Sequence, residues 1–331
     1  MSRYGATVLD PVGPVLSAEE KAFFRDSDPF AFILFARHIE HGEQLRRLCG
    51  DLREAVGREA LITIDQEGGR VQRLVPPMAT QFLPPLEEVV QAGEHATSAM
   101  LLRYRIIAHE LRSYGIDSNC APCADVAGPE THPFLQNRCY GMEEQTVTNV
   151  SRAVVNGLLA GGVVPVLKHM PGHGRAISDS HFETPRVRAS LPELQQDFAP
   201  FRALNDVPMG MTAHVQMDAL DDQPATLSAA AMEYIRNDIG FDGLIMTDDC
   251  SMQALPGSRA DVAERAIAAG VDAVLYCNGA LADKVKVAEA AGQMSEAAQA
   301  RAEMAIAARI TPENVDIAEL KAKHNALLNR A

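Results

Sequence analysis

The sequence predicts an α/β protein that folds as a single (β/α)₈ barrel of the TIM type. Eight short segments rich in apolar and β-branched residues alternate with longer amphipathic segments. Several short segments are apolar at every position, which is typical of parallel strands buried on both faces. The chain has 331 residues, more than the roughly 250 that such a barrel needs. We therefore expect one domain over residues 1–331, with a C-terminal helix at about residues 311–331 packed outside the barrel.

The eight predicted strands are spaced so that a helix fits after most of them. They are expected at residues 6–10, 31–35, 60–65, 116–122, 163–168, 208–213, 243–248 and 273–277. Between them, apolar residues recur every three or four positions, which predicts helices. The helices with the clearest pattern are expected at residues 98–113, 147–159, 191–204, 228–239 and 261–269. Gly162, Gly240 and Gly270 come just after helical segments, where glycine commonly ends a helix.

An open, doubly wound sheet is the alternative architecture, because it shows the same alternation of strands and helices. Its dinucleotide-binding version carries a G-x-G-x-x-G motif after the first strand. No such motif follows residues 6–10. This observation favours the barrel.

Composition and charge argue against several classes of partner. The net charge is −14, and an acidic surface repels phosphate backbones. The first ten residues lack the apolar run of a secretory signal, and no segment approaches the roughly 20 apolar residues of a membrane span. Six cysteines, most of them in apolar segments, suit reduced and buried thiols. We expect a cytoplasmic protein, with a monomer favoured, that binds neither nucleic acid nor membranes.

Two groups of residues resemble metal sites, and neither meets the requirements of one. Cys120 and Cys123 form a single C-x-x-C pair, whereas a structural zinc site needs a second pair. His169, His173 and His181 are spaced by four and eight residues in a segment rich in glycine and proline, not on one helix face. The H-E-x-x-H zinc motif is absent from the sequence. We therefore expect no metal and no cofactor.

Polar residues stand at the ends of four predicted strands. Barrel enzymes carry their catalytic groups where strands end and the following loops begin, at one rim. The four ends are Asp65-Gln66-Glu67-Gly68-Gly69-Arg70, Lys168-His169-Met170-Pro171-Gly172-His173-Gly174, His214, and Thr247-Asp248-Asp249. Their convergence predicts a polar pocket at that rim.

The residue types in this pocket favour a carbohydrate substrate. Carboxylates that flank a sugar ring are the usual apparatus of glycosidases, and hydroxyl groups are bound by acceptors such as Asp65 and charged donors such as Lys168 and Arg138. From the carboxylates alone, the acid would be Glu67 or Glu183.

Glu67 also has a purely structural interpretation. It would then be a buried carboxylate paired with an arginine such as Arg70 or Arg73.

Four segments carry a resemblance to a known family. They are Ile64-Asp65-Gln66-Glu67-Gly68-Gly69-Arg70-Val71-Gln72-Arg73; Asn137-Arg138-Cys139-Tyr140-Gly141; Lys168-His169-Met170-Pro171-Gly172-His173-Gly174 continuing to Asp179-Ser180-His181; and Gly240-Phe241-Asp242-Gly243-Leu244-Ile245-Met246-Thr247-Asp248-Asp249. With these segments in this order, roughly residues 5–280 resemble the bacterial β-N-acetylhexosaminidases of glycoside hydrolase family 3, in the branch that recycles peptidoglycan. The resemblance implies a retaining exo-hydrolase that removes terminal β-1,4-linked N-acetylglucosamine from anhydromuropeptides without a cofactor.

The resemblance also implies roles for individual residues, and these replace the choice of Glu67 or Glu183 as acid. Asp248 matches the nucleophile, His181 the proton donor and acceptor, and Asp179 the group that polarises His181. The positions that match the family's substrate-binding residues are Asp65, Arg73, Arg138, Lys168 and His169.

The chemistry of the implied residues fits a two-step hydrolysis. Asp248 must be ionised to attack the anomeric carbon and form a covalent glycosyl-enzyme. An imidazole such as His181 has a reference pKa near 6.5, so it can give and take a proton near neutral pH. We expect the loop at residues 172–185 to be mobile and to close over the substrate. His173 is expected to shape its loop through hydrogen bonds, and His214 either to support the site from behind the substrate-binding residues or to contact the substrate directly.

Two other functions remain open on the sequence. A histidine acid/base does not repel phosphate as a carboxylate would, so the enzyme could be a β-N-acetylglucosaminide phosphorylase. The chain could also be a non-catalytic sugar-binding barrel, although the set of Asp179, His181 and Asp248 argues against it. In each case the partner is a small saccharide or muropeptide.

Overall fold

A closed barrel of eight parallel strands forms the centre of the computed structural model, which describes residues 3–178, 183–312 and 314–329. The strands are β1 (Gly5–Leu9), β2 (Pro29–Leu34), β3 (Leu61–Ile64), β6 (Ser118–Asn119), β7 (Val164–Met170), β9 (Met209–Thr212), β11 (Leu244–Met246) and β12 (Val274–Tyr276). They pair as two sheets of order β12-β1-β2-β3 and β11-β9-β7-β6. A hydrogen bond from Cys120 N to Ile64 O (2.9 Å) joins β6 to β3, and a bridge between Met246 and Ala273 joins β11 to β12.

The predicted (β/α)₈ barrel is thus confirmed, and each barrel strand lies within or overlaps one of the predicted segments. Their side chains are buried throughout, as in β2, where all six residues are inaccessible. The strand predicted at residues 116–122 is the least regular, because β6 covers only Ser118–Asn119. Pro122 has no backbone N–H with which to continue the ladder.

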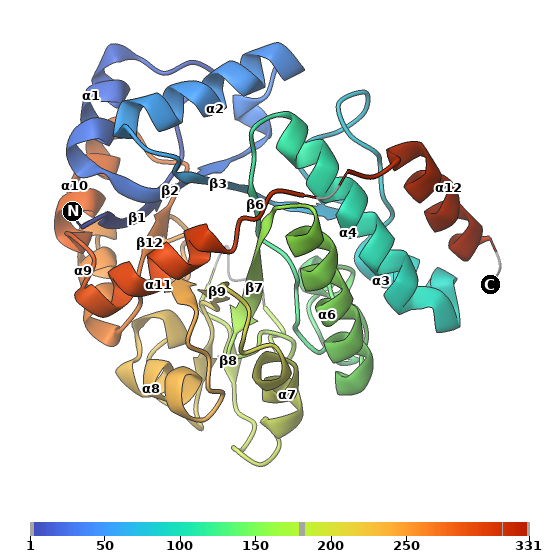
Figure 1. Ribbon diagram of the computed structural model, residues 1–331. Coiled ribbons are helices and arrows are strands. Elements are labelled where there is room, and N and C mark those ends of the chain that lie inside the picture. The colour runs from blue at the N-terminus through green and yellow to red at the C-terminus, as the bar shows by residue number, and fades with distance from the viewer. Residues whose placement is uncertain (1–2, 179–182, 313, 330–331) are drawn as a thin grey trace.

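Helices surround the barrel as a ring (Figure 1). Those that match the five predicted helices are α4 (Ala96–Ser113), α6 (Glu144–Ala160), α7 (Gln195–Ala203), α8 (Ala229–Asn237) and α9 (Arg259–Ala269). The others in the described residues are α1 (Ala18–Ser27), α2 (Gly42–Val56), α3 (Pro85–Ala92), α5 (Pro133–Gln136), α10 (Leu281–Ala291), α11 (Glu296–Ala307) and α12 (Ile317–Leu328). Helix α7 begins later than predicted because Glu193 accepts a hydrogen bond from the backbone N of Ser190 (2.7 Å) and forms a turn there.

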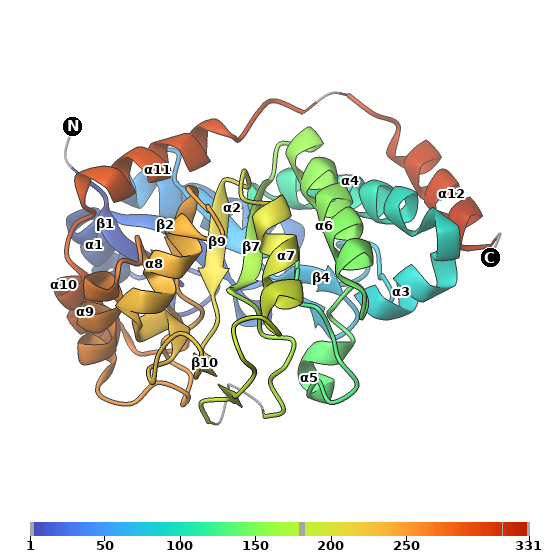
Figure 2. The ribbon, with the colours of Figure 1, turned by 90° about the horizontal axis from the view of Figure 1, so that it is seen from below.

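The two ends of the barrel differ. Helix α11 crosses the amino end of the strands, where Gln299 accepts a hydrogen bond from the backbone N of Tyr4 (3.0 Å). At the carboxyl end lie the hairpin of β4 (Gln66–Gly68) and β5 (Val71–Gln72), the short pair β8 (Arg186–Val187) and β10 (Gln216–Met217), and α5. Figure 2 shows α11 on one side of the strands and β10 and α5 on the other. Helix α11 and both short strand pairs were not predicted from the sequence.

Helix α12 lies outside the ring of barrel helices, beside α3 and α4 (Figures 1 and 2). This is the place expected for the C-terminal helix. Of the helices in the described part of the chain, none has both the length and the apolar character that crossing a membrane requires.

Candidate active site

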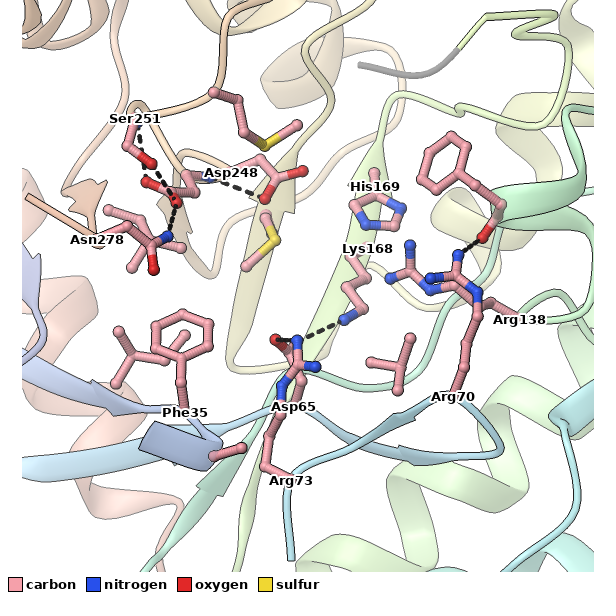
Figure 3. Close-up of a pocket in the computed structure, with 18 of the residues that line it drawn as sticks. Phe35, Asp65, Arg70, Arg73, Arg138, Lys168, His169, Asp248, Ser251 and Asn278 are labelled. Atoms are coloured by element: carbon pink, nitrogen blue, oxygen red, sulfur yellow. Dashed lines mark hydrogen bonds and ion pairs between the residues drawn. The ribbon is translucent and has the colours of Figure 1, made fainter. Parts of the chain in front are cut away.

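A cavity of about 600 Å³ opens at the carboxyl ends of the strands. It is lined by the six site residues predicted at Asp65, Arg73, Arg138, Lys168, His169 and Asp248, which come from the ends of three barrel strands, β3, β7 and β11, and from two loops. Figure 3 shows them around one space, with Asp65 and Arg73 on one side and Asp248 on the other. Ile33, Met211 and Leu275 contribute apolar lining. Cavities with a few converging polar groups on an apolar wall are typical of small-ligand sites.

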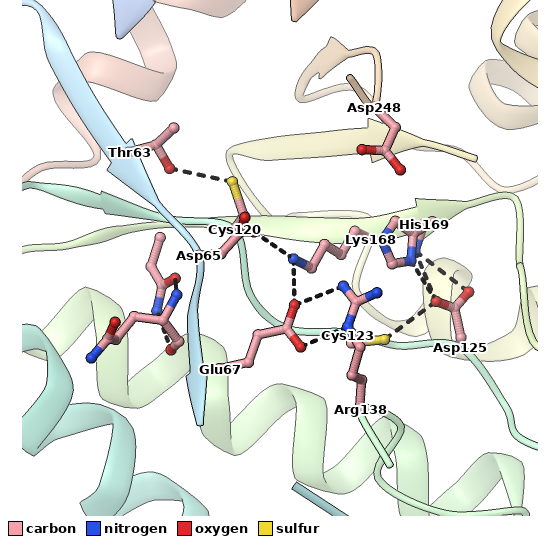
Figure 4. Close-up of polar contacts among 12 residues, drawn as sticks. Thr63, Asp65, Glu67, Cys120, Cys123, Asp125, Arg138, Lys168, His169 and Asp248 are labelled. Atoms are coloured by element: carbon pink, nitrogen blue, oxygen red, sulfur yellow. Dashed lines mark hydrogen bonds and ion pairs between the residues drawn. The ribbon is translucent and has the colours of Figure 1, made fainter. Parts of the chain in front are cut away.

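Two carboxylates at the end of β3 organise the cations of the cavity. Lys168 Nζ lies 3.1 Å from Asp65 Oδ1 and 2.6 Å from Glu67 Oε1. Arg138 forms a two-pronged ion pair with Glu67, Nε to Oε2 at 2.9 Å and Nη2 to Oε1 at 2.8 Å. Arg73 Nη2 donates to Asp65 Oδ2 at 2.9 Å. Figure 4 shows Lys168 between Asp65 and Glu67.

Glu67 is buried and paired with an arginine, as its structural interpretation expected, but the arginine is Arg138 and not the suggested Arg70 or Arg73, and Lys168 is a second partner. Burial alone would raise the pKa of Glu67, but the charges of Arg138 and Lys168 lower that pKa to about 2. Glu67 is buried and does not line the cavity. An ionised, buried carboxylate cannot donate a proton near neutral pH, so Glu67 is not the acid. Glu183, the other candidate, is exposed and lines a separate groove.

Asp65 and Lys168 stabilise each other's charge. Burial opposes ionisation of Asp65, but Lys168 and Arg73 hold its pKa well below the usual range. Burial likewise opposes the charge on Lys168, and Glu67 and Asp65 raise its pKa. The cavity therefore presents fixed donors and acceptors of definite charge, as binding of sugar hydroxyl groups requires.

His169 is held by Asp125, a residue that was not predicted from the sequence. Its Nδ1 lies 2.7 Å from Asp125 Oδ2, and the backbone N of His173 donates to Asp125 Oδ1 at 2.6 Å. Burial would raise the pKa of Asp125, but His169 lowers that pKa to about 2. An ionised Asp125 accepts a proton donated by Nδ1, which leaves Nε2 of a neutral His169 as an acceptor. The signal in the sequence was an acidic residue soon after the strand predicted at residues 116–122.

Asp248 follows β11 and is partly exposed in the cavity. Its Oδ1 accepts a hydrogen bond from the backbone N of Asp249 at 2.8 Å. Burial alone would raise the pKa of Asp248, but its interactions with His214 and His169, the hydrogen bond from the backbone N of Asp249 and the charge of Lys168 together lower the pKa. The group is therefore an ionised carboxylate at neutral pH.

Asp249 joins the loops after β11 and β12. Its carboxylate accepts hydrogen bonds from Ser251 N (2.9 Å), Ser251 Oγ (2.6 Å), Cys277 N (3.1 Å) and Asn278 Nδ2 (2.9 Å). These four hydrogen bonds all come from the protein's own loops, which gives Asp249 a structural role. Asn278 lines the cavity and was not predicted from the sequence.

His173 and His214 are both buried. His173 lines the cavity and packs edge-on against His169, with ring centroids 5.7 Å apart. His214 Nε2 lies 3.1 Å from the carbonyl O of Asp249, and Nδ1 lies 2.8 Å from Thr226 Oγ1. Burial lowers the pKa of His173 to about 4 and also lowers the pKa of His214. A neutral His214 must carry its proton on Nε2, because a carbonyl only accepts.

One buried group in the described residues has the donor atoms of a metal site. Ligand atoms of Cys123, Asp125 and His169 all lie within 4.8 Å of one another. Asp125 is already bonded to His169, and hydrogen bonding with Cys139 and burial raise the pKa of Cys123 well above its ordinary value. A protonated thiol is a poor ligand, because metals bind the thiolate. The expectation that the protein uses no metal stays a prediction.

Asp179 and His181 lie outside the described residues, as do residues 180 and 182. Their predicted roles as polarising group and acid/base therefore stay predictions. So does the closure expected of the loop at residues 172–185.

Comparison with known proteins identifies the family of the chain. The model for the glycosyl hydrolase family 3 N-terminal domain matches residues 9–311. Beta-hexosaminidases of Tolumonas auensis and Pseudomonas aeruginosa are 34% and 35% identical over 83% of this chain, which is 83% and 82% of theirs. The crystal structure of NagZ from Neisseria gonorrhoeae with N-trifluoroacetyl-D-glucosamine has a TM-score of 0.83 at 28% identity, covering 99% of this chain and 97% of that one. The same NagZ has also been solved with a zinc ion.

Proposed function

The chain belongs to glycosyl hydrolase family 3 and is a β-hexosaminidase, and on that basis we propose that it is a retaining exo-β-N-acetylglucosaminidase. Its substrates are anhydromuropeptides of peptidoglycan recycling, from which it removes the terminal non-reducing β-1,4-linked N-acetylglucosamine. The complex of the gonococcal NagZ with an N-acylated glucosamine supports an acetamido sugar as the unit recognised. All six cysteines are free and buried, which supports a cytoplasmic location.

The observation that carries this proposal is the state of the three carboxylates that line the cavity. Asp65 is held between Lys168 and Arg73, and Asp249 accepts four hydrogen bonds from the protein. Asp248 accepts one backbone hydrogen bond and has a lowered pKa. Among the described residues it is therefore the carboxylate with an oxygen free to attack a sugar bound between the other groups.

The proposed mechanism has two steps. In the first, Asp248 attacks the anomeric carbon, the glycosidic bond breaks, and His181 gives its proton to the departing oxygen. In the second, neutral His181 takes a proton from water, which attacks the same carbon and releases Asp248. Asp179 polarises His181 in both steps. Asp65, Arg73, Arg138, Lys168 and His169 hold the sugar hydroxyl and acetamido groups.

The role of Asp248 is tested by Asp248→Gly with a chromogenic aryl β-N-acetylglucosaminide. We expect kcat to fall by about 10³-fold or more, and sodium azide to restore turnover by attacking from the vacated side, giving the α-glycosyl azide. Asp222→Gly, in an exposed loop, is the control and should keep the wild-type rate. A rate near wild type, or a β-configured azide product, would exclude Asp248 as the nucleophile.

The role of His181 is tested by the dependence of rate on the leaving group. In His181→Ala, cleavage of a disaccharide should fall by about 10²–10⁴-fold, whereas an activated aryl glycoside, which needs little protonation, should lose far less in its first step. Pre-steady-state release of the phenol measures that step. Equal losses of rate on both substrates would show that His181 is not the acid.

Phosphorolysis is separated from hydrolysis by the products formed in phosphate buffer. Free N-acetylglucosamine supports the hydrolase, and the sugar 1-phosphate would make the enzyme a phosphorylase. The third alternative, a sugar-binding barrel without activity, does not agree with the membership of the chain among the β-hexosaminidases.

A further inference from the structure

Helix α12, on the outside of the molecule, contacts a buried ionic cluster that leads to the substrate cavity. His324 on α12 is 4% exposed, and its Nε2 lies 2.9 Å from Oε1 of Glu88 on α3. The other oxygen of Glu88 accepts from Nη1 of Arg103 on α4 at 2.7 Å. Glu88 is 1% and Arg103 0% exposed. Three helices thus meet in one desolvated charge cluster.

Arg103 connects this cluster to the hairpin of β4 and β5. Its Nη2 donates to the backbone carbonyl of Glu67. The guanidinium also lies over Phe82, 4.9 Å from the ring centroid, and the His324 ring meets the same Phe82 edge-on at 5.6 Å. Arg103 and His324 are therefore held by packing against Phe82 as well as by their polar contacts.

The backbone position of Glu67 matters because its side chain holds two cations of the cavity. Lys168 and Arg138 both bond the Glu67 carboxylate, at 2.6 to 2.9 Å. A shift of the hairpin therefore moves both cations together. Figure 4 shows Glu67 with Lys168 and Arg138 directed at it from separate segments.

A second, separate series of contacts runs from α12 to the same hairpin. Lys321 Nζ lies 3.0 Å from Glu110 Oε1. Glu110 accepts from Thr80 N at 3.0 Å and from Thr80 Oγ1 at 2.6 Å. The carbonyl of Thr80 accepts from Gln72 on β5 at 2.9 Å. Gln72 precedes Arg73, which bonds Asp65 in the cavity.

We propose that α12 is a positioning element of the active site. Through His324, Glu88 and Arg103, it holds the β4–β5 hairpin in the place where Glu67 orients Lys168 and Arg138. The helix thereby sets the affinity for the sugar without touching it. This inference rests on the proposed function, in which Lys168 and Arg138 bind the sugar. A buried ion cluster can fix one arrangement of the elements around it while adding little net stability. We assign that role to the cluster of His324, Glu88 and Arg103.

The test compares His324→Leu, which removes the hydrogen-bond donor, with His324→Gln, which keeps an N–H able to reach Glu88. We expect KM for the aryl N-acetylglucosaminide and the inhibition constant of N-acetylglucosamine to rise about 5- to 20-fold in His324→Leu, with kcat within about twofold. His324→Gln should restore most of the affinity. Lys323→Ala, an exposed change on the same helix, is the control.

Lys321→Met is a second test, which breaks the contact with Glu110 and leaves the buried cluster of His324, Glu88 and Arg103 intact. It should raise KM by a smaller factor than His324→Leu does. All assays are run well below the unfolding midpoint of each variant. A lower midpoint with unchanged KM and inhibition constant in His324→Leu would show that the contact is only structural and overturn the inference. If the wild-type enzyme does not cleave the N-acetylglucosaminide, the proposed function fails instead, so the two failures are distinct.

Discussion

Asp125 shapes the active site from behind the residues that line the cavity. Its two oxygens bond His169 Nδ1 and the backbone N of His173, at 2.7 and 2.6 Å. The carboxylate therefore fixes both the ring orientation and the tautomer of His169. Such supporting contacts decide which atom a histidine presents to a ligand.

Asp125→Asn tests this arrangement. An amide that turns its NH₂ toward Nδ1 moves the His169 proton to Nε2, so the ring presents a donor where it had presented an acceptor. We expect kcat/KM to fall about 10²-fold with a native circular dichroism spectrum. Asp197→Asn, which alters a nearby buried carboxylate bonded to Arg175, should change kcat/KM only a few-fold. Equal effects of the two changes would contradict the role assigned to Asp125.

At the same scale, the sequence predicted the site residues that stand in recognisable motifs and missed two that stand in none. Asp65, Lys168 and Asp248 were found because parallel strands bring their carboxyl ends to one rim. Asp125 and Asn278 are each a single polar residue among apolar residues or glycine, with no motif of their own. Their function comes from which neighbours the closed barrel places beside them, and that information is tertiary.

The β4–β5 hairpin is the element that connects the active site with the outer helices. Gly68 lies at φ +103°, and a Cβ there would approach Arg103 Nη2 to 1.9 Å and the carbonyl of Leu83 to 2.9 Å. Only glycine allows both the backbone conformation and the close packing of Arg103.

Gly68→Ala should therefore lower the free energy of unfolding by about 1–3 kcal/mol and raise KM, because Arg103 must move. Urea unfolding and steady-state kinetics measure the two effects. Gly50→Ala is the matched control, since nothing lies within 4 Å of its added Cβ in α2 and alanine favours a helix. A loss of stability in Gly50→Ala equal to that in Gly68→Ala would contradict the steric argument.

Elements with a long periodic pattern were predicted best. The buried strands and α4, α6 and α9 each bury a regular set of side chains, and that regularity is visible in the sequence. The hairpin is only a few residues long and is held by contacts from Gln66, whose side-chain O accepts from the backbone N of Arg73 at 2.9 Å. Contacts of this kind leave no periodic pattern, so the segment was described only as a polar strand end.

The whole molecule should lose stability in acid, in two ranges of pH. Burial lowers the pKa values of His38 and His173 from 6.5 to about 4. As the pH falls from 6.5 to 4, these histidines take up protons in the unfolded chain before they do so in the folded one, so the free energy of unfolding decreases. The pKa values of Glu67 and Asp125 are lowered from 4.5 and 3.8 to about 2 by their partners. Their ionised forms therefore stabilise the fold fully above pH 4.5, and this stabilisation is lost as the pH falls toward 2. Each group contributes on the order of 1–3 kcal/mol.

Chemical unfolding at pH 7, 5.5 and 4 measures the first range. His38→Gln, whose amide O can still accept from the backbone N of Phe35 as His38 Nδ1 does at 2.9 Å, should show a shallower loss between pH 6.5 and 4. A wild-type stability that stays level or rises toward pH 4 would contradict the assignment of neutral buried histidines.

Helix α11 crosses the amino end of the barrel and the cavity opens at the carboxyl end, so among the described residues a substrate enters from the carboxyl end. In the proposed mechanism, the sugar bonded to Asp248 lies inside the cavity and the rest of the saccharide extends toward the opening, so the monosaccharide departs only after that remainder has left. Product release is then compulsorily ordered, and free N-acetylglucosamine should inhibit competitively with substrate while the shortened muropeptide should not.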